Sequence, residues 1–171
     1  HYKKGMKVLD FGCGTGSNSR LFSPEDYIGS EVDSSRVKSS GGKYPKYKFE
    51  KIPIINSSKD KLPWSDNSFD MIFVSLCLHH INAKSCKLIF KEFRRVLKSN
   101  GKILGIEPAL IDGKYFSNIL MNILDAGDYI LPLNKYKDMY KSESFTTTHI
   151  NVVKTFGYNL WQYSSVVTGE E

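Results

Sequence analysis

A short apolar run that leads into three alternating glycines constrains this chain more than any other feature of its sequence. The run Val8-Leu9-Asp10-Phe11 has the character of a buried strand, and Gly12, Gly14 and Gly16 follow it directly. Glycine has no side chain, so a ligand can approach this backbone closely. We expect residues 17–22 to start a helix, whose first N–H groups would face an anion. The sequence therefore predicts a strand, loop and helix that together bind an acidic, nucleotide-like molecule.

The spacing of these glycines argues against two common nucleotide-binding motifs. A dinucleotide fingerprint, G-x-G-x-x-G, counted from Gly12 needs a glycine at position 17, where the chain has Ser17. The sequence also contains no G-x-x-x-x-G-K-[ST] phosphate loop, which argues against ATP or GTP hydrolysis. The pattern present is Asp-x-Gly-x-Gly-x-Gly, with the carboxylate of Asp10 beside the loop.

Strand and helix patterns alternate along the chain, which is typical of an α/β domain with a parallel sheet. The length of 171 residues suits a single domain over residues 1–171. We expect strands at residues 7–11, 27–32, 48–52, 69–78, 102–107 and 158–168, and helices at 17–22, 35–46, 82–98, 116–124 and 148–156. Asp33 or Ser34 and then Asn82 are expected N-caps. The predicted fold class is α/β, a doubly wound, mostly parallel sheet of six or seven strands with helices on both faces.

The segment from Ala109 to Lys141 is too long for a simple connection after the fifth strand. Insertions of this kind often form lids or partner surfaces, although a plain packing helix explains the apolar stripe of the segment equally well. We therefore expect a helical insertion at 109–141, placed as a lid on the substrate side.

The composition narrows the setting and the partners. Lys and Arg number 24 against 18 Asp and Glu, a formal charge of +6, but both signs are scattered along the chain. A solvated Lys-rich surface explains this excess more simply than RNA binding does. Cys13, Cys77 and Cys86 form no C-x-x-C pair, so neither disulfides nor a zinc site are expected. With no apolar run long enough to span a membrane and no export signal, the prediction is a cytoplasmic protein.

The glycine motif and three later stretches resemble the class I S-adenosylmethionine-dependent methyltransferases, in their small-molecule, ubiquinone-biosynthesis-like branch. Glu31 ends the second expected strand, 19 residues after Gly12, and the stretches 62–70 and 97–102 are similar to the family's approaches to its fourth and fifth strands. The resemblance covers about residues 7–108 and implies a Rossmann-like fold with S-adenosylmethionine as cofactor. It also implies a closing antiparallel hairpin. Because only three residues follow the strand expected at 158–168, we expect the last strand to be missing or the chain to be truncated.

The resemblance also implies which residues hold the cofactor. Glu31 would accept the ribose hydroxyls, and Ser75 and Leu76 would lie beside the methionine part. Where many relatives have an Asp for the adenine amino group, this chain has Ser58 followed by Lys59, so the adenine contact departs from the pattern. The candidate cofactor-binding residues are Asp10, Gly12, Cys13, Gly14, Gly16, Glu31, Val32, Ser58, Lys59, Ser75 and Leu76.

No catalytic base is assigned from the sequence. His79 and His80 are adjacent, which is a poor pattern for metal binding, and either could act as a base or brace a turn. Glu107 and His149 are further acid–base candidates. The leading hypothesis is methyl transfer to a small-molecule acceptor, and the alternatives are an RNA (tRNA) methyltransferase and a non-catalytic cofactor-binding scaffold.

Overall fold

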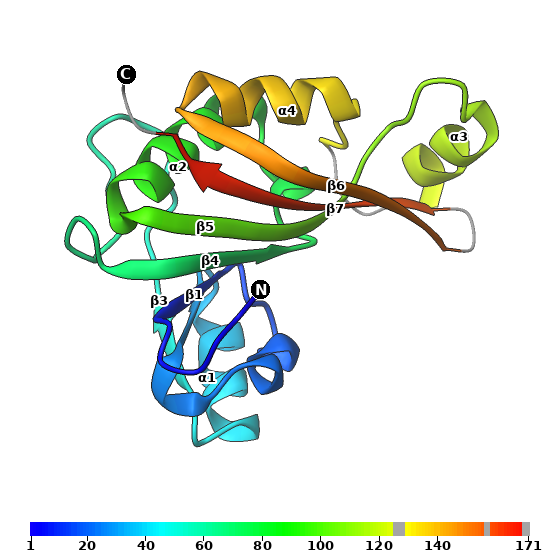
Figure 1. Ribbon diagram of the computed structural model, residues 1–171. Coiled ribbons are helices and arrows are strands. Elements are labelled where there is room, and N and C mark those ends of the chain that lie inside the picture. Colours follow the sequence, from blue (N-terminus) through cyan, green and yellow to red (C-terminus); the bar gives the residue numbers. More distant parts are fainter. Residues whose placement is uncertain (125–128, 156–157, 169–171) are drawn as a thin grey trace.

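A single sheet forms the centre of the molecule. The computed structural model describes residues 1–124, 129–155 and 158–168. Within these ranges the strands are β1 (Val8–Phe11), β2 (Tyr27–Glu31), β3 (Lys48–Lys51), β4 (Phe69–Ser75), β5 (Leu97–Pro108), β6 (Phe145–Thr155) and β7 (Tyr158–Val167), in the order β3-β2-β1-β4-β5-β7-β6 (Figure 1). The first five strands pair in parallel, and β7 runs antiparallel between β5 and β6. The predicted mostly parallel α/β sheet, with seven strands, is thereby confirmed.

Four α-helices and three short 3-10 helices connect the strands in the described ranges. They are η1 (Ser17–Leu21), η2 (Pro24–Asp26), α1 (Ser34–Lys43), η3 (Leu78–His80), α2 (Ala83–Val96), α3 (Tyr115–Leu124) and α4 (Leu133–Ser142). Both predicted N-cap positions are confirmed. The Asp33 carboxylate accepts hydrogen bonds from the N–H groups of Ser35 and Arg36, and the Asn82 side chain accepts one from Ser85 N–H.

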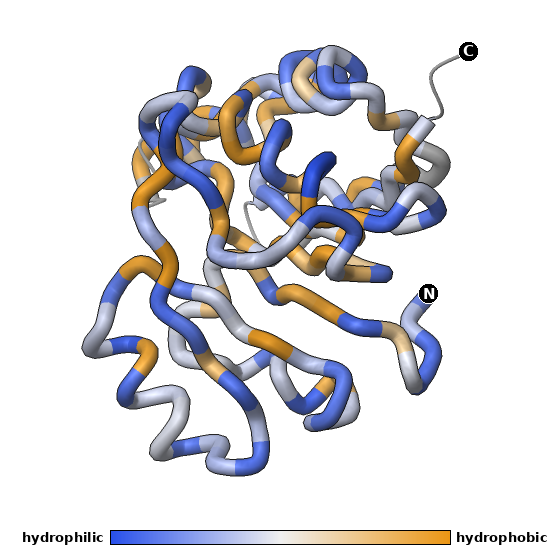
Figure 2. Tube along the Cα trace, turned by 90° about the vertical axis from the view of Figure 1, so that its left-hand side faces the viewer, coloured by the Kyte–Doolittle hydropathy of each residue, from blue (hydrophilic) through white to orange (hydrophobic). Residues whose placement is uncertain are grey.

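The core lies on both faces of the central strands. Successive residues of a strand point to opposite faces, so Val8 and Met71 join one apolar cluster while Leu9 and Ile72 join the other. The larger cluster is covered by α2 and α4, and Phe90 of α2 is fully buried there. Figure 2 shows the hydrophobic residues concentrated along the strands in the middle of the molecule, with hydrophilic residues in the outer loops. The position of β4 between β1 and β5 confirms the predicted central strand.

The helix predicted at 148–156 is wrong, because residues 148–155 belong to β6; Phe156 lies outside the described residues. Thr146 to Thr155 is rich in β-branched residues, which lose side-chain freedom in a helix and fit a pleated strand. Strand β6 pairs with β7 from Phe145 to Thr155, so the two form the antiparallel pair at the sheet edge. The expectation of a missing last strand was wrong for the same reason, since β6 is the strand that the helix assignment had hidden.

Three other boundaries differ from the prediction. Residues 17–21 form a 3-10 turn instead of a helix, so the extended row of helical N–H groups expected after the glycine loop is short. Strand β4 ends at Ser75 and not at residue 78, because Leu76 takes a left-handed backbone conformation with φ of 52°. Helix α2 ends at Val96 and runs directly into β5 at Leu97, so the helix expected at 82–98 is shorter and the strand expected at 102–107 begins earlier.

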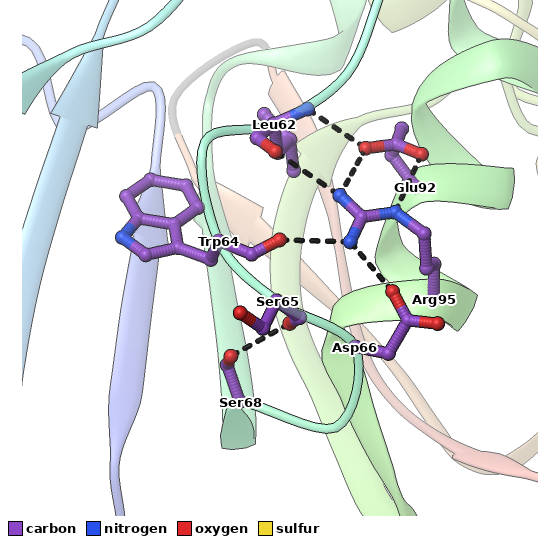
Figure 3. Close-up of polar contacts among 7 residues, drawn as sticks. All are labelled: Leu62, Trp64, Ser65, Asp66, Ser68, Glu92 and Arg95. Atoms are coloured by element: carbon purple, nitrogen blue, oxygen red, sulfur yellow. Dashed lines mark hydrogen bonds and ion pairs between the residues drawn. The ribbon is translucent and has the colours of Figure 1, made fainter.

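One guanidinium ties the loop before β4 to α2. Arg95 donates to the carbonyl oxygens of Leu62 and Trp64, at 3.0 and 2.7 Å, and to the carboxylates of Asp66 and Glu92 (Figure 3). Glu92 in turn accepts a hydrogen bond from Leu62 N–H at 2.7 Å. These hydrogen bonds hold residues 62–66 against α2 and so fix the segment that leads into β4.

The segment 109–141 contains α3 and α4, which confirms a helical insertion after the fifth strand. Helix α4 buries Tyr136, Met139 and Tyr140 in the core. Helix α3 lies beyond the end of β5 in Figure 1 and leaves four large apolar side chains exposed. They are Tyr115, Phe116, Ile119 and Ile123. Within the described ranges, no helix has both the length and the apolar character needed to cross a membrane.

Gly105 tests how tightly β5 and β7 are paired. A Cβ at this position would lie 2.1 Å from Cζ of the buried Tyr163 ring, so we expect Gly105→Ala to lower the free energy of unfolding by about 1 to 3 kcal/mol. Urea denaturation measures this change. In a Tyr163→Ala background the same substitution should cost much less, and an equal cost in both backgrounds would contradict the packing. The control Gly41→Ala, where a Cβ meets open space in α1, should instead stabilise the protein slightly.

Candidate functional site

A cavity of about 960 Å³ opens where β1, β2 and β4 end. In an open α/β sheet ligands collect at the carboxyl ends of the strands, where the strand order reverses, and here the chain departs from β1 first to β2 and later to β4. Five segments and one further residue form most of the wall. They are residues 12–15, 31–33, 52–55, 75–77 and 80–82, together with Tyr129.

The glycine loop after β1 depends on two of its glycines for separate reasons. Gly12 has a φ of 71°, and a Cβ there would lie 2.2 Å from the Sγ atom of Cys77, so no larger residue fits. Gly14 has a φ of 55° but open space around its Cα, so its backbone faces the cavity without a side chain. The N–H groups of Gly12 and Cys13 both donate to the Ser30 carbonyl, which fixes the loop to the neighbouring strand.

Glu31 links the end of β2 to this loop. Its side chain lines the cavity and is 6% exposed. One carboxylate oxygen accepts from Gly14 N–H at 3.1 Å, and the other accepts from the N–H groups of Val32 and Asp33 at 2.8 and 3.2 Å. A carboxylate has about four acceptor positions, so roughly one remains for a donor from a ligand.

Asp10 lies behind the loop and does not line the cavity. It is 1% exposed, and its Oδ2 atom accepts a hydrogen bond from the Tyr27 hydroxyl at 2.7 Å. Its Oδ1 atom has no partner within the described part of the chain. Burial raises the pKa of Asp10 to about 7, against the lowering effect of the Tyr27 hydrogen bond. Asp10 therefore makes no direct contact with a ligand in the cavity. Its predicted role in cofactor binding would act through the loop in front of it.

The two cysteine thiols that line the cavity are held protonated. Burial, followed by the charges of Asp10 and Glu31, raises the pKa of Cys13 well above its usual range. Burial, followed by the charges of Glu107, Glu31 and Asp10, has the same effect on the pKa of Cys77. The thiolate, the form in which cysteine acts as a nucleophile, is therefore disfavoured at both positions.

The structure brings together most of the predicted cofactor residues but not all of them. Those that line the cavity are Gly12, Cys13, Gly14, Glu31, Val32, Ser75 and Leu76. Gly16 lies outside the cavity and packs against the Phe49 ring. Ser58 and Lys59 also lie outside it, in an exposed turn. Asp60 holds this turn by accepting from two backbone N–H groups, which keep the pKa of Asp60 below its usual range. The wall on this side is formed instead by the apolar residues 52–55, which the sequence did not indicate.

The sequence indicated Glu107 as an acid–base candidate but did not place it relative to the site. It is fully buried at the end of β5 and does not line the cavity, so the structure places it away from direct contact with a ligand. Its carboxylate accepts from the N–H groups of Cys77 and Leu78 at 2.8 and 3.0 Å and contacts His79 Nδ1 at 2.8 Å. In the sequence, Glu107 was visible as an acid at the end of an expected strand, directly before Pro108. Of the two histidines, His80 lines the cavity.

The chemistry available at the cavity is that of carboxylate acceptors, bare backbone and apolar walls. Glu31 suits a ligand with hydroxyl donors, and the apolar residues 52–55 suit a flat or aliphatic group. Among the described residues, the search finds no group of three His, Cys, Asp or Glu side chains that could hold a metal ion. The arrangement therefore points to an organic ligand that offers a hydroxyl donor to Glu31 and an apolar group to residues 52–55.

Comparison with known families decides between the possible ligand-binding classes. The family model described as a methyltransferase domain matches residues 9–105, more than half of the chain. The chain belongs to the methyltransferase domain family. The resemblance to the class I methyltransferases is thereby confirmed, and the matched region contains both the glycine loop and Glu31 of this methyltransferase domain.

Individual relatives match about two thirds of the chain. A sterol 24-C-methyltransferase of Gibberella zeae is 33% identical over 117 residues, which are 66% of this chain and 30% of that protein. A demethylmenaquinone methyltransferase of Staphylococcus aureus is 32% identical over 112 residues, 63% of this chain and 45% of that protein. The match thus spans less than half the length of either relative. The structure of a SAM-dependent methyltransferase of Methanosarcina mazei superposes with a TM-score of 0.77 at 16% identity, covering 98% of this chain and 95% of that one, and shows the same fold.

The buried carboxyl of Asp10 predicts a pH dependence of stability. Its pKa is about 7 in the folded chain against 3.8 as the reference, so between about pH 4 and 7 the unfolded chain loses a proton that the folded chain keeps. The free energy of unfolding should therefore fall as pH rises through this window, by at most about 4 kcal/mol from this group. In Asp10→Asn this contribution disappears. Urea denaturation of both proteins at pH 4.5 and 7.5 measures it, and an identical pH dependence would contradict the assignment.

Proposed function

We propose that this chain binds S-adenosylmethionine in the cavity and transfers its methyl group to a small-molecule acceptor. The observation that carries the proposal is that one cavity is lined by both the bare backbone of residues 12–14 and the buried carboxylate of Glu31. Membership of the methyltransferase domain family supports it. So do the relatives, one named for a sterol and one for a menaquinone precursor as the methyl acceptor.

Each part of the proposed cofactor has a matching surface. Glu31 would accept a ribose hydroxyl at the acceptor position that its three backbone hydrogen bonds leave open. Val32 and residues 52–55 would pack against the adenine ring, in place of the polar contact expected from Ser58. The backbone around Gly12 and the end of β4 at Ser75 would lie along the amino-acid part.

The cavity volume supports a second ligand beside the cofactor. At about 960 Å³ it lies at the upper end of the range for small-molecule sites. The remaining wall includes His80, Ile81, Ile89 and Tyr129, which suit a partly apolar acceptor. The sulfonium of S-adenosylmethionine supplies an activated methyl group. The contribution of the protein is then to hold donor and acceptor in line, and oriented reactions of this kind gain up to about 7 to 11 kcal/mol.

The alternative acceptor, RNA, remains a prediction from charge. Binding to RNA through the Lys and Arg residues at 36–51 and 84–102 should weaken steeply with added salt. A mobility-shift assay at low salt distinguishes the two acceptor classes, because the small-molecule proposal expects no RNA complex.

Titration of S-adenosylhomocysteine by calorimetry tests the proposed site. We expect saturable binding by the intact chain and a loss of affinity of about 10- to 100-fold in Glu31→Ala, because a hydrogen bond to a carboxylate contributes about 1.5 to 3 kcal/mol. Glu50→Ala is the matched control, since Glu50 lies on the adjacent strand β3, pairs with Lys48 and does not line the cavity. No binding by the intact chain at millimolar ligand, or equal affinity of Glu31→Ala, would refute the assignment.

A further inference from the structure

The end of β5 holds the turn that follows β4. The Glu107 carboxylate is 0% exposed and accepts from the N–H groups of Cys77, Leu78 and, at 3.4 Å, His79. Three consecutive backbone donors thus converge on one side chain from a neighbouring strand. Leu76 N–H also bonds to the Ile106 carbonyl at 2.9 Å, so β5 fixes the whole turn from Leu76 to His79.

This turn needs such an anchor because its backbone is strained. Leu76 has a φ of 52°, a left-handed conformation that costs a residue with a side chain free energy and persists only where the surroundings enforce it. Leu76 itself is partly exposed and lines the cavity, so its own side chain contributes little packing that could enforce the conformation. The hydrogen bonds from β5 are the interactions that hold it.

Glu107 also connects to a second segment of the cavity wall through His79. A carboxylate that accepts backbone N–H groups is an acceptor toward His79 as well, so Nδ1 of the ring donates across the 2.8 Å contact. The carbonyl of His79 then accepts from Tyr129 N–H at 2.9 Å. Tyr129 belongs to the insertion after β5 and lines the cavity. One buried carboxylate therefore connects two wall segments that are about 50 residues apart in the sequence.

We propose that Glu107 is a positioning residue that sets the cavity wall formed by Leu76, Cys77, His80 and Tyr129. It touches no ligand and acts through the turn after β4 and through His79. The inference rests on the proposed function in one respect, that this wall lies next to the methionine part of the cofactor and to the methyl acceptor. A residue that only stabilised the fold would raise local and distant motions together, whereas a positioning residue alters this wall selectively.

Amide hydrogen exchange of Glu107→Gln tests the geometry directly and needs no ligand. Glutamine keeps the shape of the side chain and one acceptor oxygen. Its NH₂ group replaces the other oxygen and faces either the N–H groups of Cys77 and Leu78 or those of His79, from which it cannot accept. We expect exchange at residues 77–79 and at Tyr129 to accelerate by about tenfold or more, with unchanged exchange in the β1–β2 pair. Equal acceleration throughout the sheet, or no change at Tyr129, would overturn the proposal.

Glu92→Gln is the matched control. Glu92 is also a buried carboxylate that accepts a backbone N–H group, from Leu62, but it lies outside the cavity. In the Glu92→Gln variant, the amide exchange rates at residues 77–79 and at Tyr129 should equal those of the unchanged protein. If both variants accelerate exchange at these residues equally, the effect is general destabilisation and the proposal is wrong.

S-adenosylhomocysteine serves as the probe of the wall itself. At a temperature where both variants remain folded, we expect about tenfold weaker binding by Glu107→Gln and binding within twofold of the unchanged protein by Glu92→Gln. If Glu107→Gln changes the exchange rates but not the affinity for the probe, the proposal is overturned, because this wall would then not contribute to ligand binding. If the unchanged protein does not bind the probe, the proposed function is wrong, and the exchange data alone still decide the role of Glu107.

A second variant covers the case in which Glu107→Gln does not fold. His79→Leu keeps the backbone groups of the turn and removes only the ring donor to Glu107. We expect faster exchange at Tyr129 and at Cys77 in this variant, since the carboxylate loses the contact that orients it. Unchanged exchange at both residues would contradict the connection through His79.

Discussion

Backbone N–H groups that donate to buried carboxylates hold the loops around the cavity in place. Glu31 accepts three such groups at the end of β2, and Glu107 accepts three at the end of β5. A buried carboxylate is costly unless it is paired, and buried N–H groups are costly unless they have acceptors, so each satisfies the other. Side chains at the ends of β2 and β5 therefore hold the glycine loop, the turn after β2 and the turn after β4 in place.

The parallel sheet gives these carboxylates their common location. Strands β2, β1, β4 and β5 all end at the same edge, so acids at their carboxyl ends surround one opening. The loop after β1 and the turn after β4 meet there so closely that Gly12 has no room for a Cβ beside Cys77. A larger residue at Gly12 would therefore displace Cys77, which couples the glycine loop to the wall that Glu107 supports.

Features that depend on local chemistry could be predicted from the sequence, and those that depend on long-range contacts could not. The glycine loop, the cap at Asn82 and a central strand follow from residue type and spacing, although the strand expected at 69–78 ends at Ser75. The helix expected at 148–156 failed because residues 148–155 are rich in β-branched residues, which fit the strand that they form. The contacts of Glu107 and the wall at 52–55 arise from pairing across strands, which spacing along one strand does not encode.

The protonated thiols of Cys13 and Cys77 have a chemical consequence for an alkylating cofactor. A sulfonium is an electrophile, and a thiolate beside it would compete with any acceptor for the transferred carbon. The carboxylates around the cavity disfavour a second negative charge on either sulfur, as the raised pKa values of both cysteines reflect. Burial and these acids thus favour the thiol form of both sulfurs, so a methyl donor bound as proposed would lie beside weak nucleophiles.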